Sequence, residues 1–171
     1  SRPGEVMLEA RNLTGNSVEN ISFVLHRGEV LGFAGLVGSG RTETAELICG
    51  AKKTDSGELF LLGRKVSVHS PAEAIKQGIV LIPEDRKEQG VILHNTVLFN
   101  TSLSGTDKVT KHGFISRALN EKLAEQYCRE LRIKVPHIRE MVVNLSGGNQ
   151  QKVVLAKSLA AEPDIIIFDE P

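Results

Sequence analysis

Tryptophan is absent from this sequence, and other aromatic residues are scarce, with one Tyr and six Phe among 171 residues. The hydrophobic fraction still reaches 40%, and charged residues make up 25%, as in an ordinary globular domain with a core of its own. We therefore expect a core built mainly from aliphatic side chains.

Long hydrophobic runs are also missing, and no signal peptide is recognisable. The longest apolar stretches, Val30 to Val37 and Ile165 to Phe168, fall far below the roughly 18 residues that a membrane-spanning helix needs. Any attachment to a membrane is therefore expected to depend on a partner protein.

Net charge is missing too, because 21 Lys and Arg balance 21 Asp and Glu. No overall basic field is available to hold nucleic acid or anionic lipid, so we expect no nucleic-acid partner. The two cysteines, Cys49 and Cys128, lie far apart and fit no metal-ligand spacing. They are interpreted as small buried apolar side chains of a protein in a reducing compartment.

Apolar strand-like segments alternate with helix-like segments along the chain, which predicts an α/β fold with a mostly parallel core sheet covered by helices. The early strands are expected to form a separate antiparallel layer, and residues 96–145 an inserted helical section, within one domain that spans 1–171. The expected strands are 7–12, 18–25, 30–34, 58–62, 65–68, 79–82 and 165–169, and the expected helices are 42–49, 71–77, 97–103, 116–131 and 149–160, with a loop at 104–115.

Local signals mark where three helices start and which side of one helix is buried. Ser70, Thr96 and Ser146 are expected to cap the helices that follow them. Leu119, Leu123, Tyr127 and Leu131 recur at four-residue intervals, which predicts one apolar face.

Gly35 to Thr42 (GLVGSGRT) follows an expected strand and opens an expected helix, which is the context of a phosphate-binding loop. Glycines let the backbone turn so that successive N–H groups converge on phosphate oxygens, and the helix N-terminus adds a favourable dipole. The alternative is a plain glycine turn. The predicted nucleotide-binding residues are Gly35, Val37, Gly38, Ser39, Gly40, Arg41, Thr42 and Glu43, with the Thr42 hydroxyl as a magnesium ligand.

Arg41 departs from this pattern, which has lysine before the hydroxyl residue. A guanidinium keeps the positive charge but is wide and planar, whereas an ammonium is compact enough to fit between phosphates. We predict weaker or altered nucleotide binding at this loop.

Two acids end the last apolar segment, an arrangement known as Walker B. Asp169 is placed to hold magnesium through water, and Glu170 to polarise an attacking water as general base. Acids at the exposed end of a strand also occur without a catalytic role, so this motif alone leaves both interpretations open.

The octet Leu145 to Lys152 (LSGGNQQK) is the strongest signal in the sequence. Ser146 can cap a helix, and the two glycines leave the helix N-terminal amides uncovered, which makes an anion site. A helix cap alone would account for the serine and one glycine. It would not account for the whole octet shortly before the acidic strand.

Together these motifs resemble ATP-binding cassette proteins. The octet is similar to the signature motif of that family, the order of phosphate loop, signature and carboxylate strand is the same, and the resemblance covers essentially the whole chain. It implies the ABC-type P-loop fold, ATP and Mg²⁺ as ligands, and hydrolysis of ATP. In this family two cassettes enclose two nucleotides, so the signature acts in trans on the partner cassette's nucleotide. The matching signature residues are Leu145, Ser146, Gly147, Gly148, Asn149 and Gln150.

A finer resemblance rests on Gly35 to Glu43 (GLVGSGRTE), Pro83 to Lys87 (PEDRK) and the octet. These resemble the second, C-terminal cassette of bacterial tandem-cassette importers of ribose, galactose, xylose or arabinose, in which Arg at position 41 is typical. The resemblance implies a peripheral ATPase at the cytoplasmic face of the plasma membrane. Its implied partners are a second cassette, fused or separate, membrane permease subunits and, indirectly, a periplasmic or lipid-anchored sugar-binding protein.

Three departures from the family pattern predict reduced catalytic power. Glu84 stands where cassettes usually have a glutamine, and Leu13 to Val18 offers no aromatic side chain to stack on adenine. No histidine stands where the family has its switch histidine, because the sequence stops at Pro171. We therefore expect a C-terminally truncated cassette that is weakly active or inactive alone.

The expected consequence is asymmetry: the signature serves the partner's site, and the Arg41 loop builds a weaker site. Two alternatives stay open. One is a cassette ATPase that acts on nucleic acid or the ribosome instead of in transport. The other is a regulatory cassette that binds nucleotide without hydrolysing it.

Overall fold

The computed structural model describes residues 4–36, 38–83, 92–103, 110–111 and 114–169. They belong to two compact units, residues 1–81 and 82–171, and each unit is described by itself. Within the described ranges, no helix combines the length and the apolar character that crossing a bilayer requires.

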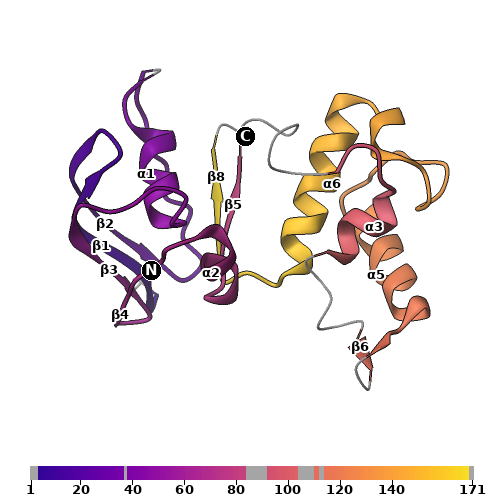
Figure 1. Cartoon of the computed structure of the whole chain (residues 1–171), viewed down its shortest axis with the longest axis horizontal. Helices are drawn as coiled ribbons and strands as arrows, with labels where there is room; N and C mark the ends of the chain where they lie inside the picture. The colour runs from indigo at the N-terminus through magenta and orange to yellow at the C-terminus, as the bar shows by residue number, and fades with distance from the viewer. Residues whose placement is uncertain (1–3, 37, 84–91, 104–109, 112–113, 170–171) are drawn as a thin grey trace. The chain divides into compact units, whose positions relative to one another are not determined.

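The first unit is built on a four-stranded antiparallel sheet in which strand β1 is central (Figure 1). The strand order is β2-β1-β3-β4, and β1 buries Met7, Leu8, Ala10 and Leu13. The strands are β1 (Val6–Gly15), β2 (Val18–His26), β3 (Ser56–Leu61) and β4 (Arg64–Val66). This confirms the predicted separate antiparallel layer.

Two-residue turns close both hairpins of this sheet. Asn16 and Ser17 have φ of 47° and 68°, and Leu62 and Gly63 have φ of 49° and 74°. Turns with two positive φ values match the right-handed twist of the strands that they connect. Asn and Gly tolerate that backbone region better than other residues, so Asn16 and Gly63 each favour one position of their turn.

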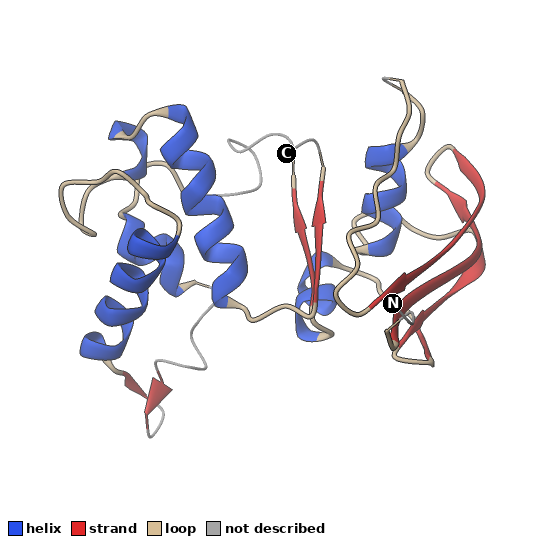
Figure 2. Ribbon diagram, turned by 180° about the vertical axis from the view of Figure 1, so that it is seen from behind, coloured by secondary structure: helices blue, strands red, loops and turns tan. Residues whose placement is uncertain are grey.

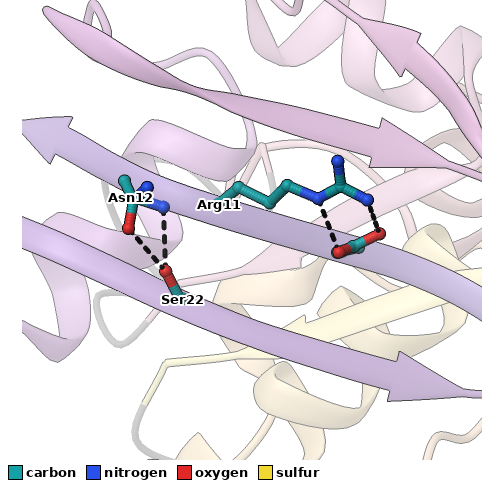
Figure 3. A network of polar contacts seen from close by, with 4 residues as sticks. Arg11, Asn12 and Ser22 are labelled. Atoms are coloured by element: carbon teal, nitrogen blue, oxygen red, sulfur yellow. Dashed lines mark hydrogen bonds and ion pairs between the residues drawn. The ribbon is translucent and has the colours of Figure 1, made fainter.

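A bulge in β1 is stabilised by side chains (Figure 3). The pairing of β1 with β2 shifts register between Ala10 and Leu13, and Asn12 has φ of 51°. Asn12 N donates to Ser22 Oγ at 2.8 Å, and Ser22 Oγ donates to Asn12 Oδ1 at 3.3 Å. The side chain of Ser22 thus takes the place of a backbone partner that the bulge removes.

Next to the bulge, Arg11 makes an exposed cluster on the sheet. Its Nε and Nη2 donate to the Glu9 carboxylate at 2.6 and 3.0 Å, and its guanidinium carbon lies 4.3 Å from the Phe60 ring centroid. The ion pair is solvent-exposed and contributes little to stability. It lowers the pKa of Glu9, mainly through the hydrogen bond from Arg11.

Two helices complete the first unit. Helix α1 (Arg41–Ile48) packs against β2, and the left-handed Gly50 (φ 69°) follows its last turn. Helix α2 (Pro71–Lys76) has the predicted cap, since the side chain of Ser70 accepts a hydrogen bond from Glu73 N at 3.2 Å.

The predicted strand at 30–34 is wrong. Residues 29–36 form no regular element, and Val30 and Leu36 are 98% and 86% exposed. The prediction rested on an apolar run between glycines, but a strand also needs a neighbour that pairs with its N–H and C=O groups. No strand pairs with this segment among the described residues. Within this segment, Phe33 lies edge-on to Phe23 of β2, with 5.2 Å between ring centroids.

The second unit contains a group of helices (Figure 2) in which α3 packs against both α5 and α6. The helices are α3 (Val97–Ser102), α5 (Arg117–Glu130), the 3₁₀ helix η1 (Val142–Asn144) and α6 (Gly147–Ala160). Thr96 caps α3 as predicted, because its side chain accepts from Phe99 N at 3.1 Å. Val97, Val142 and Val153 are fully buried.

Two predictions for this unit need correction. The face of α5 that is buried carries Ala124 and Tyr127, whereas Leu119 is exposed, because periodicity indicates a face but not how far a neighbouring helix extends along it. The predicted loop at 104–115 contains the paired strands β6 (Thr110–Lys111) and β7 (Phe114–Ile115), which are too short to leave a periodic signal.

A two-stranded sheet joins β5 (Ile79–Ile82) and β8 (Ile165–Phe168), both predicted as strands. Asp169 N donates to Ile82 O at 3.0 Å. Since both residues stand at the carboxyl ends of their strands, the two strands run in the same direction. The expected aliphatic core is confirmed, because Tyr127 is the one aromatic side chain among the buried apolar residues of the described ranges.

Candidate functional site

The predicted phosphate loop turns tightly on itself before α1. Ser39 N donates to Leu36 O at 3.0 Å, and Gly38 and Gly40 have φ of 80° and 89°, a region that strains other residues. A Cβ added to Gly35 would lie 2.2 Å from Ser39 Oγ. The shape of this loop therefore requires its glycines, which a plain connecting turn would not need at all three positions.

Helix α1 starts at Arg41 without a side-chain cap. Gly40 occupies the N-cap position, and its carbonyl accepts from Thr44 N at 2.9 Å and from Thr44 Oγ1 at 2.6 Å. Arg41 is half-buried and Thr42 is exposed in the first turn, where Glu43 is also located. A guanidinium and a hydroxyl beside a helix N-terminus suit the binding of an anion. Val37 lies outside the described residues.

The tip of the β1–β2 hairpin braces this helix, a feature that sequence reasoning missed. Asn16 Nδ2 donates to Glu46 Oε2 at 2.8 Å and to Glu43 O at 3.3 Å. A Cβ added to Gly40 would lie 2.4 Å from Val18 Cγ1, so Val18 packs directly on the start of α1. No local signal in the segment Leu13–Val18 connects it to the distant helix.

The signature octet opens α6 in the second unit. Leu145 is buried, whereas Ser146 and Gly148 are exposed, and a Cβ added to Gly148 would meet no atom within 4 Å. Helix α6 begins at Gly147, two residues before the predicted start. The octet therefore presents a hydroxyl and an open glycine position at the beginning of a 14-residue helix.

The predicted side-chain cap by Ser146 is wrong. Ser146 occupies the N-cap position but makes no side-chain cap hydrogen bond. Its Oγ accepts instead from Asn149 Nδ2 at 3.0 Å, because the Asn149 amide reaches the hydroxyl from one turn further along α6. Asn149 Oδ1 in turn accepts from Lys134 N at 2.9 Å.

The side chain of Gln150 also forms hydrogen bonds within the second unit. Its Nε2 donates to Leu145 O at 3.0 Å and to Val142 O at 3.2 Å, with a weaker contact to Val143 O at 3.5 Å. These carbonyls belong to the segment that leads into Ser146. The second half of the octet thus holds the first half in place.

The acidic end of β8 is only partly described. Asp169 is half-buried, and its backbone is fixed by the hydrogen bond to Ile82 O. Glu170, the predicted general base, and Glu84, at the position of the family's glutamine, lie outside the described residues. Their roles remain predictions.

The predicted magnesium ligands are Thr42, in the first unit, and Asp169, in the second. A hydroxyl and a carboxylate are the hard oxygen donors that Mg²⁺ prefers, so the residue types fit the ion. No group of three or more His, Cys, Asp or Glu side chains within the described ranges could hold a metal by itself. Magnesium would therefore rely on substrate phosphates as further ligands, as is usual for this ion.

A sequence profile described as "ABC transporter" matches residues 18–171. The xylose import ATP-binding protein XylG of Thermoanaerobacter pseudethanolicus is 46% identical over 99% of this chain and 35% of its own length. The ribose import ATP-binding protein RbsA 2 of Rubrobacter xylanophilus is 46% identical over 99% of this chain and 33% of its own length.

A third relative is a putative ribose/galactose/methyl galactoside import ATP-binding protein of Rhizobium meliloti, which is 45% identical over 99% of this chain and 34% of its own length. The chain spans about a third of the length of these curated relatives. Its sequence is thus close to one section of each of them.

Solved structures support the fold alone, because their identity is low. A dimeric ATP-binding cassette in a post-hydrolysis state, bound to ADP and Pi, has a TM-score of 0.79 at 24% identity, covering 96% of this chain and 74% of that one. A nucleotide-free cassette has a TM-score of 0.74 at 22% identity, covering 97% of this chain and 69% of that one.

Proposed function

Because this chain belongs to the ABC transporter family and is closely related to the ATP-binding proteins of sugar importers, we propose that it binds and hydrolyses ATP to energise import of a sugar. The proposal places it as the second of two cassettes, in contact with permease subunits at the cytoplasmic face of a bacterial membrane. A periplasmic or lipid-anchored sugar-binding protein would deliver the cargo.

The observation that carries this proposal is the signature turn. Ser146 and Gly148 are exposed at the start of α6, and Asn149 and Gln150 hold that turn from behind. An exposed hydroxyl at the N-terminus of a helix suits a phosphate group brought by another cassette. These features support the proposal that the turn serves a nucleotide in trans.

The phosphate loop is proposed to bind a second nucleotide less effectively. Its glycines have the backbone conformations that a phosphate cradle needs, but Arg41 replaces the compact ammonium of lysine. Hydrolysis would proceed by in-line attack of water on the γ-phosphate. Loop amides, Arg41 and Mg²⁺ held by Thr42 and Asp169 would stabilise charge, and Glu170 would polarise the water.

The two sites can be separated by mutation of the full-length protein. Ser146→Arg places a large cation in the signature turn and is expected to abolish sugar transport, whereas Arg41→Ala is expected to reduce it less. Transport into vesicles and steady-state ATPase activity would be measured for both variants. Equal losses would contradict the asymmetry between the two sites.

Binding at the phosphate loop has its own test. Calorimetric titration of this 171-residue chain with Mg²⁺–ATP is expected to show binding, and the Thr42→Ala variant of the same chain is expected to show none. If binding survives in Thr42→Ala, the assignment of the loop as the nucleotide site would be wrong.

An exposed apolar surface of the second unit supports the contact with a permease. Hydrogen bonds from Val142 N to Asn95 O and from Val143 N to Leu93 O join two segments beside the start of α3. Large apolar side chains are exposed on these segments and on α3: Ile92, Phe99, Leu103, Met141 and Val143. Exposed apolar patches of this kind mark interaction surfaces.

This contact is expected to be sensitive to Phe99→Ser and Met141→Ser. Both variants should copurify less with permease subunits while they bind ATP normally. Leu62→Ser, which changes an exposed apolar residue of the first unit, is the matched control. Normal copurification of both test variants would contradict the assignment of this surface.

A regulatory cassette that binds ATP without hydrolysing it is a second candidate, favoured by Arg41 and Glu84. Single-turnover hydrolysis in the full-length protein, with the partner's phosphate loop disabled, would distinguish the two. Product formation that depends on Glu170 supports hydrolysis, and its absence supports the regulatory candidate.

A further inference from the structure

The side chain of Asn149 is held from two sides. Lys134 N donates to Asn149 Oδ1 at 2.9 Å, and Asn149 Nδ2 donates to Ser146 Oγ at 3.0 Å. A backbone N–H can only donate, so the atom that faces Lys134 must be the amide oxygen. The orientation of the amide is therefore determined by its hydrogen bonds, with the NH₂ group toward Ser146.

This orientation determines where the Ser146 hydroxyl proton can point. The hydroxyl oxygen accepts from Asn149 Nδ2, and a hydroxyl has one proton to donate. Since the NH₂ group offers no acceptor, the proton must point away from Asn149. Ser146 is exposed and makes no side-chain cap bond to α6, so the hydroxyl is not used as a cap of its own helix.

The support for Asn149 is itself anchored. Lys152 Nζ donates to Arg132 O at 3.0 Å, which ties α6 to the segment that carries Lys134 N. On the other side, Gln150 Nε2 donates to Leu145 O at 3.0 Å, directly before Ser146. Residues of α6 thus hold both the donor that orients Asn149 and the backbone that carries the serine.

We propose that Asn149 is a positioning residue that turns the Ser146 hydroxyl proton outward, toward a phosphate oxygen of the nucleotide held by the partner cassette. A phosphate oxygen only accepts hydrogen bonds and therefore requires a donor. Asn149 itself does not touch the nucleotide. The inference rests on the proposed function of the signature turn in trans.

The test is a double-mutant cycle in the full-length protein assembled with its partner cassette. Ser146→Ala is expected to lower kcat of ATP hydrolysis about 10-fold or more, because it removes a charge-assisted hydrogen bond. Asn149→Ala is expected to lower kcat about 5-fold, with a smaller change in KM. In the Ser146→Ala background, Asn149→Ala should cause no further loss, because it acts only through the hydroxyl.

Asn149→Asp sharpens the test. It keeps an acceptor for Lys134 N but replaces the NH₂ donor with an oxygen, so the Ser146 proton would turn back to the carboxylate. Its loss of kcat should approach that of Ser146→Ala. Gln151→Glu adds the same charge two residues further along α6, at an exposed position, and should cause a clearly smaller loss.

The outcomes separate the positioning role of Asn149 from the proposed function of the signature turn. Additive losses in the cycle, or equal losses in Asn149→Asp and Gln151→Glu, would overturn the positioning role while leaving the signature function intact. An unchanged kcat in Ser146→Ala would overturn the proposed function and, with it, this inference. Thermal unfolding of each variant identifies any variant that is misfolded. The cycle is a second control, because a misfolded Asn149→Ala variant would lose further activity in the Ser146→Ala background.

Discussion

The phosphate loop and the signature turn both contain glycines at the N-terminus of a helix, but their shapes are stabilised in different ways. In the phosphate loop, Gly38 and Gly40 have positive φ, and no side chain caps α1. In the signature turn, Gly147 and Gly148 lie within α6. There the side chains of Asn149 and Gln150 hold the turn.

The difference shows why each motif contains glycine. In the first loop the backbone conformation strains residues other than glycine. In the second turn the conformation is helical and tolerates any residue, so glycine is needed for the space in front of the helix, where a Cβ on Gly148 would meet nothing within the unit. Substitution of a glycine should therefore lower stability in the phosphate loop and impair function in the signature turn.

The largest expected effect on stability is that of Gly40→Ala. The new Cβ would lie 2.4 Å from Val18 Cγ1 at a φ of 89°. Backbone strain and the clash together should lower the free energy of unfolding by about 3 kcal/mol. Urea unfolding measures this loss. Gly38→Ala has a similar φ but open space around it, so it should cost about 1 kcal/mol. Equal losses would show that Val18 does not brace the loop.

Gln150→Ala should come next, with a loss of about 2 kcal/mol, because it removes the side-chain donor of the Leu145 carbonyl and one of the two donors of the Val142 carbonyl. Gln151→Ala, an exposed neighbour on the same helix, should change stability by less than about 0.5 kcal/mol. Urea unfolding at neutral pH compares the two. A loss in Gln150→Ala no greater than in the control would refute the role of this side chain in holding the turn.

Cys49 extends the comparison to the far end of α1, where burial raises the pKa of its thiol from 9.0 to about 12. The unfolded chain then loses this proton before the folded one does, so stability is fully present below about pH 9 and falls above it. The loss should reach about 1.4 kcal/mol near pH 10. Comparing the free energies of unfolding of the wild type and of Cys49→Ala at pH 8 and 10 isolates the contribution of the Cys49 thiol. An identical pH dependence in the two proteins would contradict it.

The smallest expected effect on stability is that of Gly148→Ala, a gain of about 0.5 kcal/mol, since alanine is the better helix former. The same substitution should lower ATPase activity of the full-length protein, because the methyl group occupies space proposed for a phosphate. Unchanged activity would indicate that glycine is present at this position for another reason.

Local sequence was sufficient for most elements. The Ser70 and Thr96 caps depend on a few adjacent residues, and both were predicted correctly. The apolar run at 30–34 was predicted as a strand, yet Val30 is exposed, because pairing with a neighbouring strand is not encoded in the run itself.

For the candidate site, the sequence by itself determined which residue types are available: a glycine-rich loop with Arg41 and Thr42, the octet with Ser146, and the acid Asp169. These are properties of composition and order along the chain. Only the tertiary structure decided that Val18 packs on Gly40 and that Lys134 N orients Asn149. Such contacts join residues 15 or more positions apart, and the folded backbone, which no local pattern specifies, brings them together.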